Sequence, residues 1–165
     1  MIVVADSSPL IVLAKLLYLD FLSKLYSRLC ISTEVHYEVV VAGAGLPGAA
    51  EVENANWIEV KPLQNKADLL TAQQRCSLGA GELSTILLGK ELGADIVLLD
   101  DFDARKLART EGLQVRGSIG LLEAFYRRGY LADLRAAFRQ LLGHNIYVDQ
   151  RLLDDRLRSL GLPLL

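Results

Sequence analysis

The sequence predicts an α/β protein, with a central parallel sheet covered by helices on both sides. Short apolar segments such as residues 2–5 and 95–99 have the composition of strands that are buried on both faces. Segments with helical spacing separate the strands, and this alternation indicates a parallel sheet with right-handed crossovers. The length of 165 residues suits one domain with a substantial core.

Five segments are predicted as strands because they are short and mostly apolar, with turn or polar residues at their ends. They are residues 2–5, 28–31, 57–60, 95–99 and 113–115. The continuous apolar run of residues 96–99 places the segment 95–99 in the centre of the sheet. Residues 57–60 alternate between apolar and polar side chains, so we expect them near an edge.

Nine segments are predicted as helices from the spacing of their apolar residues and from the residues at their ends. They are residues 7–14, 18–26, 33–40, 49–56, 82–92, 101–110, 117–127, 131–142 and 149–160. Asp6-Ser7-Ser8-Pro9 ends the first strand and begins a helix, because Asp and Ser are good N-caps and proline suits a first helical turn. Residues 65–76 are polar and ambiguous.

The net charge of −2 provides no overall attraction to nucleic acid. Residues 1–100 hold 7 Lys and Arg against 12 Asp and Glu, whereas residues 101–165 hold 11 against 8. An acidic site beside a basic flank would suit a metal-dependent enzyme that acts on a polyanion. Scattered charges on solvated helix faces explain the same counts equally well.

Cys30 and Cys76 have no metal-ligand spacing, and we expect both to be reduced thiols. The N-terminal apolar run reaches Asp6 too soon for a signal peptide, and no apolar run approaches the length of a membrane span. We therefore expect a cytoplasmic protein that has no contact with the membrane.

Asp100 and Asp101 directly follow a buried strand, where two adjacent like charges repel each other. Either a cation lies beside them or the pair is more exposed than its position indicates, and we favour the cation. Asp6 follows the first strand. Because ligands bind beyond the carboxyl ends of parallel strands, Asp6 and the Asp100–Asp101 pair are expected at the same edge.

Two glutamates are further candidates for this edge. Glu38 lies in a helix beside a run of valines, and Glu82 begins a helix whose N-terminal dipole favours a carboxylate. Mg²⁺ and Mn²⁺ prefer oxygen ligands, and a two-metal phosphodiesterase site needs several converging carboxylates. Each residue also has a structural alternative, because Asp6, Glu82 and Asp101 could cap helices and Glu38 could be solvated. Glu34 competes with Glu38 on the same helix.

Four motifs resemble those of PIN-domain proteins. The opening Asp6-Ser7-Ser8 after an apolar strand is similar to the start of these proteins, and the other three motifs resemble one PIN-like branch. They are Gly81-Glu82-Leu83-Ser84, Val97-Leu98-Leu99-Asp100-Asp101 with Ala104-Arg105 and Ala108, and Gly117-Ser118-Ile119-Gly120-Leu121-Leu122.

The resemblance implies a PIN-like three-layer α/β/α domain over residues 1–142, with a central parallel sheet of four to five strands. It also implies a Mg²⁺- or Mn²⁺-dependent ribonuclease, often the toxin that a small antitoxin protein binds. By this analogy the metal ligands and catalytic carboxylates would be Asp6, Glu38, Glu82 and Asp100 or Asp101. Ser8 would orient Asp6 or a water. The commonest PIN toxins carry Asp where this chain has Glu82.

Residues 143–165 form a predicted C-terminal helical extension rich in leucine, which either packs on the domain or meets a second copy or a partner protein. Arg105 and Arg109 share a helix face. They would contact RNA phosphates or pair with Asp101 and Glu111, and pairing is favoured.

Three functions are consistent with the sequence. The first is a metal-dependent ribonuclease, and the second is a PIN-like protein that binds an antitoxin or RNA without cleaving it. The third is a receiver-like domain with a single phosphorylated Asp. A receiver should show an acidic pair after its first strand, where this chain has only Asp6.

Overall fold

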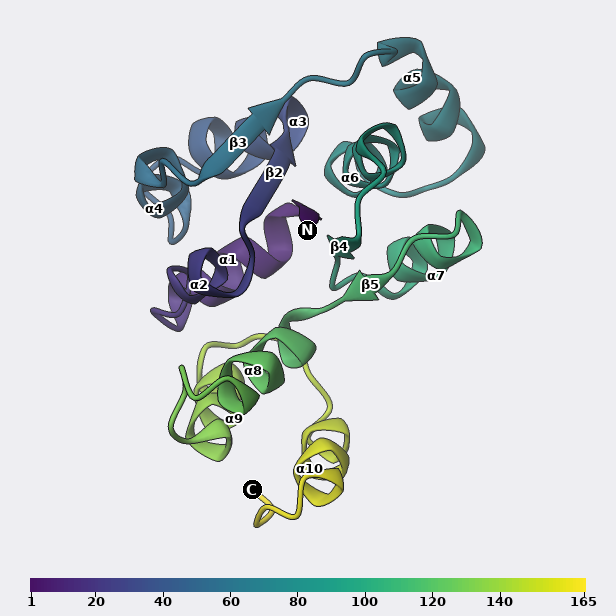
Figure 1. Ribbon diagram of the computed structural model, residues 1–165. Helices are drawn as coiled ribbons and strands as arrows, with labels where there is room; N and C mark the ends of the chain where they lie inside the picture. The colour runs from purple at the N-terminus through teal and green to yellow at the C-terminus, as the bar shows by residue number, and fades with distance from the viewer.

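The computed structural model describes residues 1–165 and contains one five-stranded parallel sheet (Figure 1). The strands are β1 (Ile2–Ala5), β2 (Arg28–Ser32), β3 (Ile58–Lys61), β4 (Ile96–Leu98) and β5 (Val115–Arg116). Their order is β3-β2-β1-β4-β5, and each neighbouring pair is parallel. The predicted fold class is confirmed. A receiver-like order of 2-1-3-4-5 is excluded.

Ten α-helices and one π-helix connect and cover the strands. They are α1 (Ser7–Lys15), α2 (Phe21–Leu25), α3 (Thr33–His36), η1 (Tyr37–Ala42), α4 (Ala49–Asn54), α5 (Lys66–Arg75), α6 (Ala80–Leu92), α7 (Phe102–Thr110), α8 (Ser118–Arg127), α9 (Leu134–Gly143) and α10 (Gln150–Ser159). None of these helices combines the length and apolar character needed to cross a membrane.

The helix predicted over residues 18–26 is shortened to α2, and the strand predicted over residues 113–115 is shifted to β5. Three further elements differ from the sequence prediction. The helix predicted over residues 33–40 changes from α to π geometry at Tyr37. The ambiguous segment 65–76 contains α5, which begins where the Asn65 side chain accepts a hydrogen bond from the Ala67 N–H at 3.1 Å. The helix predicted from residue 131 begins at Leu134, because Asp133 is its N-cap.

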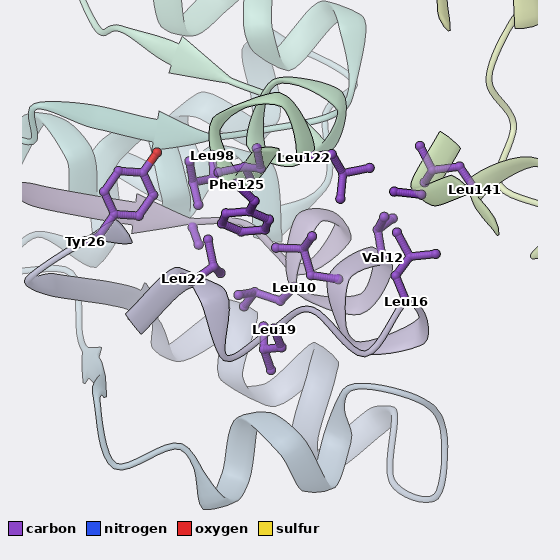
Figure 2. Close-up of a cluster of buried hydrophobic side chains, with 14 of the residues drawn as sticks. Leu10, Val12, Leu16, Leu19, Leu22, Tyr26, Leu98, Leu122, Phe125 and Leu141 are labelled. Carbon is purple, nitrogen blue, oxygen red and sulfur yellow. The ribbon is translucent and has the colours of Figure 1, made fainter. Parts of the chain in front are cut away.

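The sheet separates two layers of helices, because successive strand residues point to opposite faces. Val3, Ala5 and Leu98 pack with α1, α2, α8, α9 and α10 in the larger core. Val4 and Val97 pack with α5, α6 and α7 in the smaller core. In Figure 2, the Phe125 ring lies among aliphatic side chains of the larger core from several elements. This packing fixes the carboxyl ends of β1 and β4 against the helices that follow them.

The C-terminal segment packs on the domain. Leu153 and Leu157 of α10 are fully buried in the larger core. Arg156 donates two hydrogen bonds to Glu123 of α8, at 2.5 and 2.6 Å. Figure 1 shows α8, α9 and α10 grouped together, with the C-terminus close to α10. Contact of this segment with a second copy or a partner protein stays a prediction.

Candidate active site at the carboxyl ends of β1 and β4

Asp6 lies at the point where the strand order of the sheet reverses. Its backbone N–H donates to the carbonyl of Leu98 at 3.0 Å, which places it beside the end of β4. The side chain is only 3% exposed, yet it makes no capping bond to α1, and its Oδ1 has no hydrogen-bond partner. A buried carboxylate oxygen without a partner is costly, so it needs an explanation other than helix capping.

The electrostatics of Asp6 link it to three other acidic residues. Burial raises the pKa of Asp6 to about 7, although the backbone hydrogen bond from Ser7 acts in the opposite direction. The negative charges of Glu82, Glu38 and Asp100 contribute to this upward shift. These three carboxylates are therefore close enough to act on the charge of Asp6. A cation among them would relieve the repulsion.

Glu38 reaches this edge from the π-helix η1. The Ser7 hydroxyl donates to Glu38 Oε2 at 2.5 Å. A Cβ on Gly81 would lie 2.6 Å and 2.8 Å from the two Glu38 carboxylate oxygens, so a side chain there would displace the carboxylate from its position. Glu34 instead accepts a hydrogen bond from its neighbour Thr33 at 3.1 Å. Of the two competing glutamates, Glu38 is the one at this edge, and π-helical turns are frequent at functional sites.

Glu82 lies in the first turn of α6. A Cβ on Gly79 would approach its Oε2 to 2.7 Å, so the carboxylate folds back over the start of its own helix. Two buried serines hold this helix end in place. Ser84 donates to the Gly81 carbonyl at 2.9 Å, and its hydroxyl lies 2.7 Å from that of Ser32 at the end of β2. The contact fixes Glu82 relative to the strand ends.

Asp100 follows β4 after one further buried residue, and three hydrogen bonds hold it. Ser118 donates its backbone N–H to Oδ1 and its hydroxyl to Oδ2, both at 2.7 Å. The Ser8 hydroxyl donates to Oδ2 at 3.1 Å. Ser8 thus contacts Asp100 and not Asp6, so the predicted contact with Asp6 is wrong, whereas orientation of a water by Ser8 stays a prediction.

Asp101 has a different position from its neighbour. It is exposed, and its Oδ1 accepts the Ala104 N–H at 2.8 Å as the N-cap of α7. The charge of Asp101 is not among those that raise the pKa of Asp6. The geometry thus selects Asp100 as the member of the pair that joins the other carboxylates and gives Asp101 a capping function.

Arg105 makes no ion pair, so the predicted pairing with Asp101 and Glu111 is wrong. Glu111 pairs with Lys90 instead. A Cβ on Gly117 would lie 3.1 Å from Arg105 Nη1 and 3.0 Å from Asp100 Oδ1. The guanidinium is therefore free and lies near Asp100.

Two serines of the site were missed as functional candidates. Ser7 binds Glu38 and Ser118 binds Asp100, but the partners are 31 and 18 residues apart. Both serines stand in the quoted motifs, in Asp6-Ser7-Ser8 and in Gly117-Ser118. That signal could have identified them as site residues, but not their partners.

The carboxylate oxygens of Asp6, Glu38, Glu82 and Asp100 are suitable ligands for Mg²⁺ or Mn²⁺, which prefer oxygen donors. As the side chains stand, no group of three His, Cys, Asp or Glu residues is close enough to enclose a metal ion. Mg²⁺ keeps several waters and uses one or two carboxylates directly, so it does not need such a group. The unpartnered Asp6 Oδ1 is the atom most suited to a cation.

Comparison with known proteins agrees with the fold. The structure resembles that of a PilT N-terminus domain protein from the hyperthermophilic archaeon Sulfolobus solfataricus P2, with a TM-score of 0.54. The two chains are 19% identical, and the match covers 75% of this chain and 92% of the other. The search of curated proteins found no match. A family model described as a PIN domain matches residues 2–162, and the chain therefore belongs to the PIN-domain family.

Proposed function

We propose that this protein is a ribonuclease that depends on Mg²⁺ or Mn²⁺, which Asp6, Glu38, Glu82 and Asp100 would hold partly through bound waters. PIN-domain proteins are in general nucleases. The observation that supports the proposal most strongly is the buried carboxylate of Asp6, whose Oδ1 has no partner and which lies near three other acidic residues. Such an arrangement destabilises the folded protein without a cation, so a purely structural explanation does not account for it.

When bound, the metal would activate water and neutralise charge that develops on the phosphodiester. The protein supplies the fixed geometry for this reaction. Ser118 and Ser8 hold both oxygens of Asp100, and Ser7 holds Glu38. Because these bonds leave little freedom of rotation, the carboxylates are positioned before substrate binds. Arg105, which has no ion pair, is available to bind a phosphate of the RNA.

The direct test is cleavage of a labelled single-stranded RNA by purified protein. We expect products with Mn²⁺ or Mg²⁺ and none in EDTA, with activity restored when metal is added back. RNA binding without cleavage under all metal conditions would contradict the proposal and support a non-catalytic binding protein.

Thermal unfolding tests the metal site without relying on activity. We expect Mn²⁺ to raise the melting temperature relative to EDTA, because a cation that binds only the folded state stabilises it. At a free concentration ten times the Kd, the gain is about 1.4 kcal/mol. The Asp6→Asn variant should show a smaller increase. Identical melting in Mn²⁺, Mg²⁺ and EDTA would exclude a metal site here.

A further inference from the structure

A cavity of about 730 Å³ opens beside the carboxylate edge. Asp100 forms part of its lining, together with Ser8 and Ser118, which each donate a hydrogen bond to Asp100. The cavity thus begins at a residue of the candidate active site. Its volume lies in the range of pockets that hold small organic groups, which is about 300–1,000 Å³.

Part of the cavity wall beyond Asp100 is apolar, and this part comes from several elements. Its apolar side chains are Val12 of α1, Leu141 of α9, Leu152 of α10, and Ile146 and Val148 of the intervening segment. The C-terminal segment therefore builds much of this wall. The Glu123–Arg156 ion pair, which also lines the cavity, fixes α10 against α8 and so holds the wall in position.

The charged groups around the cavity favour a ligand with a phosphate at one end. Arg105 lines the cavity near Asp100 and has no ion pair, whereas the Arg156 charge is neutralised by Glu123. Arg116 donates to the Tyr26 hydroxyl at 2.8 Å and also has no carboxylate partner. Asp149 caps α10 through the Arg151 N–H. Arg105 and Arg116, which have no carboxylate partner, thus line the same cavity as the apolar side chains.

We propose that this cavity holds one nucleoside of the RNA, next to the phosphate at the carboxylates; the inference rests on the proposed function. The apolar wall contacts the flat base, which is unpaired in single-stranded RNA and free to enter. The exposed Tyr147 at the lining provides a ring on which a base can stack. The C-terminal segment therefore contributes to substrate preference.

The first test uses neutral probes, so that repulsion by the carboxylates does not interfere. ¹⁵N-labelled wild-type protein in EDTA is titrated with adenosine, cytidine, uridine and, as a control, ribose. We expect at least one nucleoside to shift the amide signals of residues 146–152, and ribose to leave them unchanged. No nucleoside response, or equal responses to nucleosides and ribose, would overturn the proposal.

The second test measures cleavage by variants in which a tryptophan fills the cavity. We expect Val148→Trp to raise the KM for RNA about tenfold, since the ring would occupy the place of the base and remove its stacking contact. Leu152→Trp, at a half-exposed position, is the second variant if Val148→Trp does not fold. Leu70→Trp on exposed α5 is the matched control and should leave the KM unchanged. A wild-type KM in the folded cavity variants would overturn the proposal and leave the ribonuclease function intact.

The two proposals fail in different ways. Nucleoside binding in EDTA without cleavage in any metal would reject the ribonuclease function and support the nucleoside cavity. Cleavage without a nucleoside response would reject the cavity alone.

Discussion

Asp6 and Glu123 are both buried carboxylates, 3% and 6% exposed, but their surroundings differ completely. Glu123 accepts two hydrogen bonds from Arg156, so its charge is compensated and α10 is fixed to α8. Asp6 has no cationic partner, lies near three other acidic residues, and has one oxygen without any hydrogen bond. Glu123 therefore has a sufficient structural explanation, and Asp6 does not.

The two buried carboxylates contribute to different properties of the protein: Glu123 contributes to stability, and we propose that Asp6 contributes to function. The Glu123–Arg156 pair connects the last helix to the domain, where loss of Arg156 would leave a buried charge without a partner and lower stability. The unpartnered carboxylate lies at the switch point of the sheet, where ligands bind in parallel α/β folds. We expect substitutions in the two regions to have opposite effects on stability and activity.

The largest effect is expected on cleavage. Asp6→Asn and Asp100→Asn should each lower metal-dependent RNA cleavage by about 100-fold or more, because each removes a charge that positions the metal. Initial rates in Mn²⁺ provide the measurement, and Asp20→Asn, which changes an exposed carboxylate on another edge, is the control. Wild-type cleavage by either variant would remove that residue from the active site.

The next effect concerns stability and pH. The pKa of Asp6 is about 7 in the folded protein against 3.8 for the free side chain, so the folded state binds more protons between these values. The contribution of Asp6 to stability is present below pH 4, falls as the pH rises to 7, and stays low above it.

The Asp6→Asn variant does not titrate at this position. In EDTA we expect it to exceed the wild type in unfolding free energy by roughly 2–4 kcal/mol at pH 8 and to lose this advantage by pH 4. Urea unfolding across this pH range measures the difference. If the variant were less stable than the wild type at pH 8, the conclusion that the negative charge of Asp6 destabilises the folded protein would be wrong.

A smaller effect, a decrease in stability instead of an increase, is expected when Glu123 loses its partner. Arg156→Ala leaves buried Glu123 without its partner and should lower the unfolding free energy by about 2 kcal/mol. Arg158→Ala on the same helix breaks an exposed pair with Asp155 and should cost less than about 0.5 kcal/mol. Equal losses of unfolding free energy in the two variants would show that the buried pair stabilises the protein no more than the exposed pair does.

The smallest effect is expected at Asp101, beside Asp100. Asp101→Asn should change neither cleavage nor stability appreciably, because Asn caps a helix as well as Asp does. Asp101→Ala should lower the unfolding free energy by about 1 kcal/mol and retain cleavage. Loss of cleavage in Asp101→Asn with an unchanged melting temperature would return Asp101 to the active site.

The sequence alone was sufficient for the fold class and for the set of candidate carboxylates from which the structure brings four to one edge. Strands and helices have local periodicities, and the carboxyl ends of parallel strands necessarily lie at the same edge. These two rules placed Asp6 and Asp100 together although they are 94 positions apart in the chain. Helix α5 was ambiguous, because its polar sequence has only one fully buried residue, Leu69.

Only the tertiary structure decided which of two neighbouring candidates reaches the site. Adjacent residues such as Asp100 and Asp101 point in different directions, and the choice depends on contacts with distant Ser8 and Ser118. The Glu123–Arg156 pair and the cavity that the C-terminal segment completes also depend on contacts between distant parts of the chain. Local patterns determine the elements, whereas partners far apart in the sequence meet only when those elements pack.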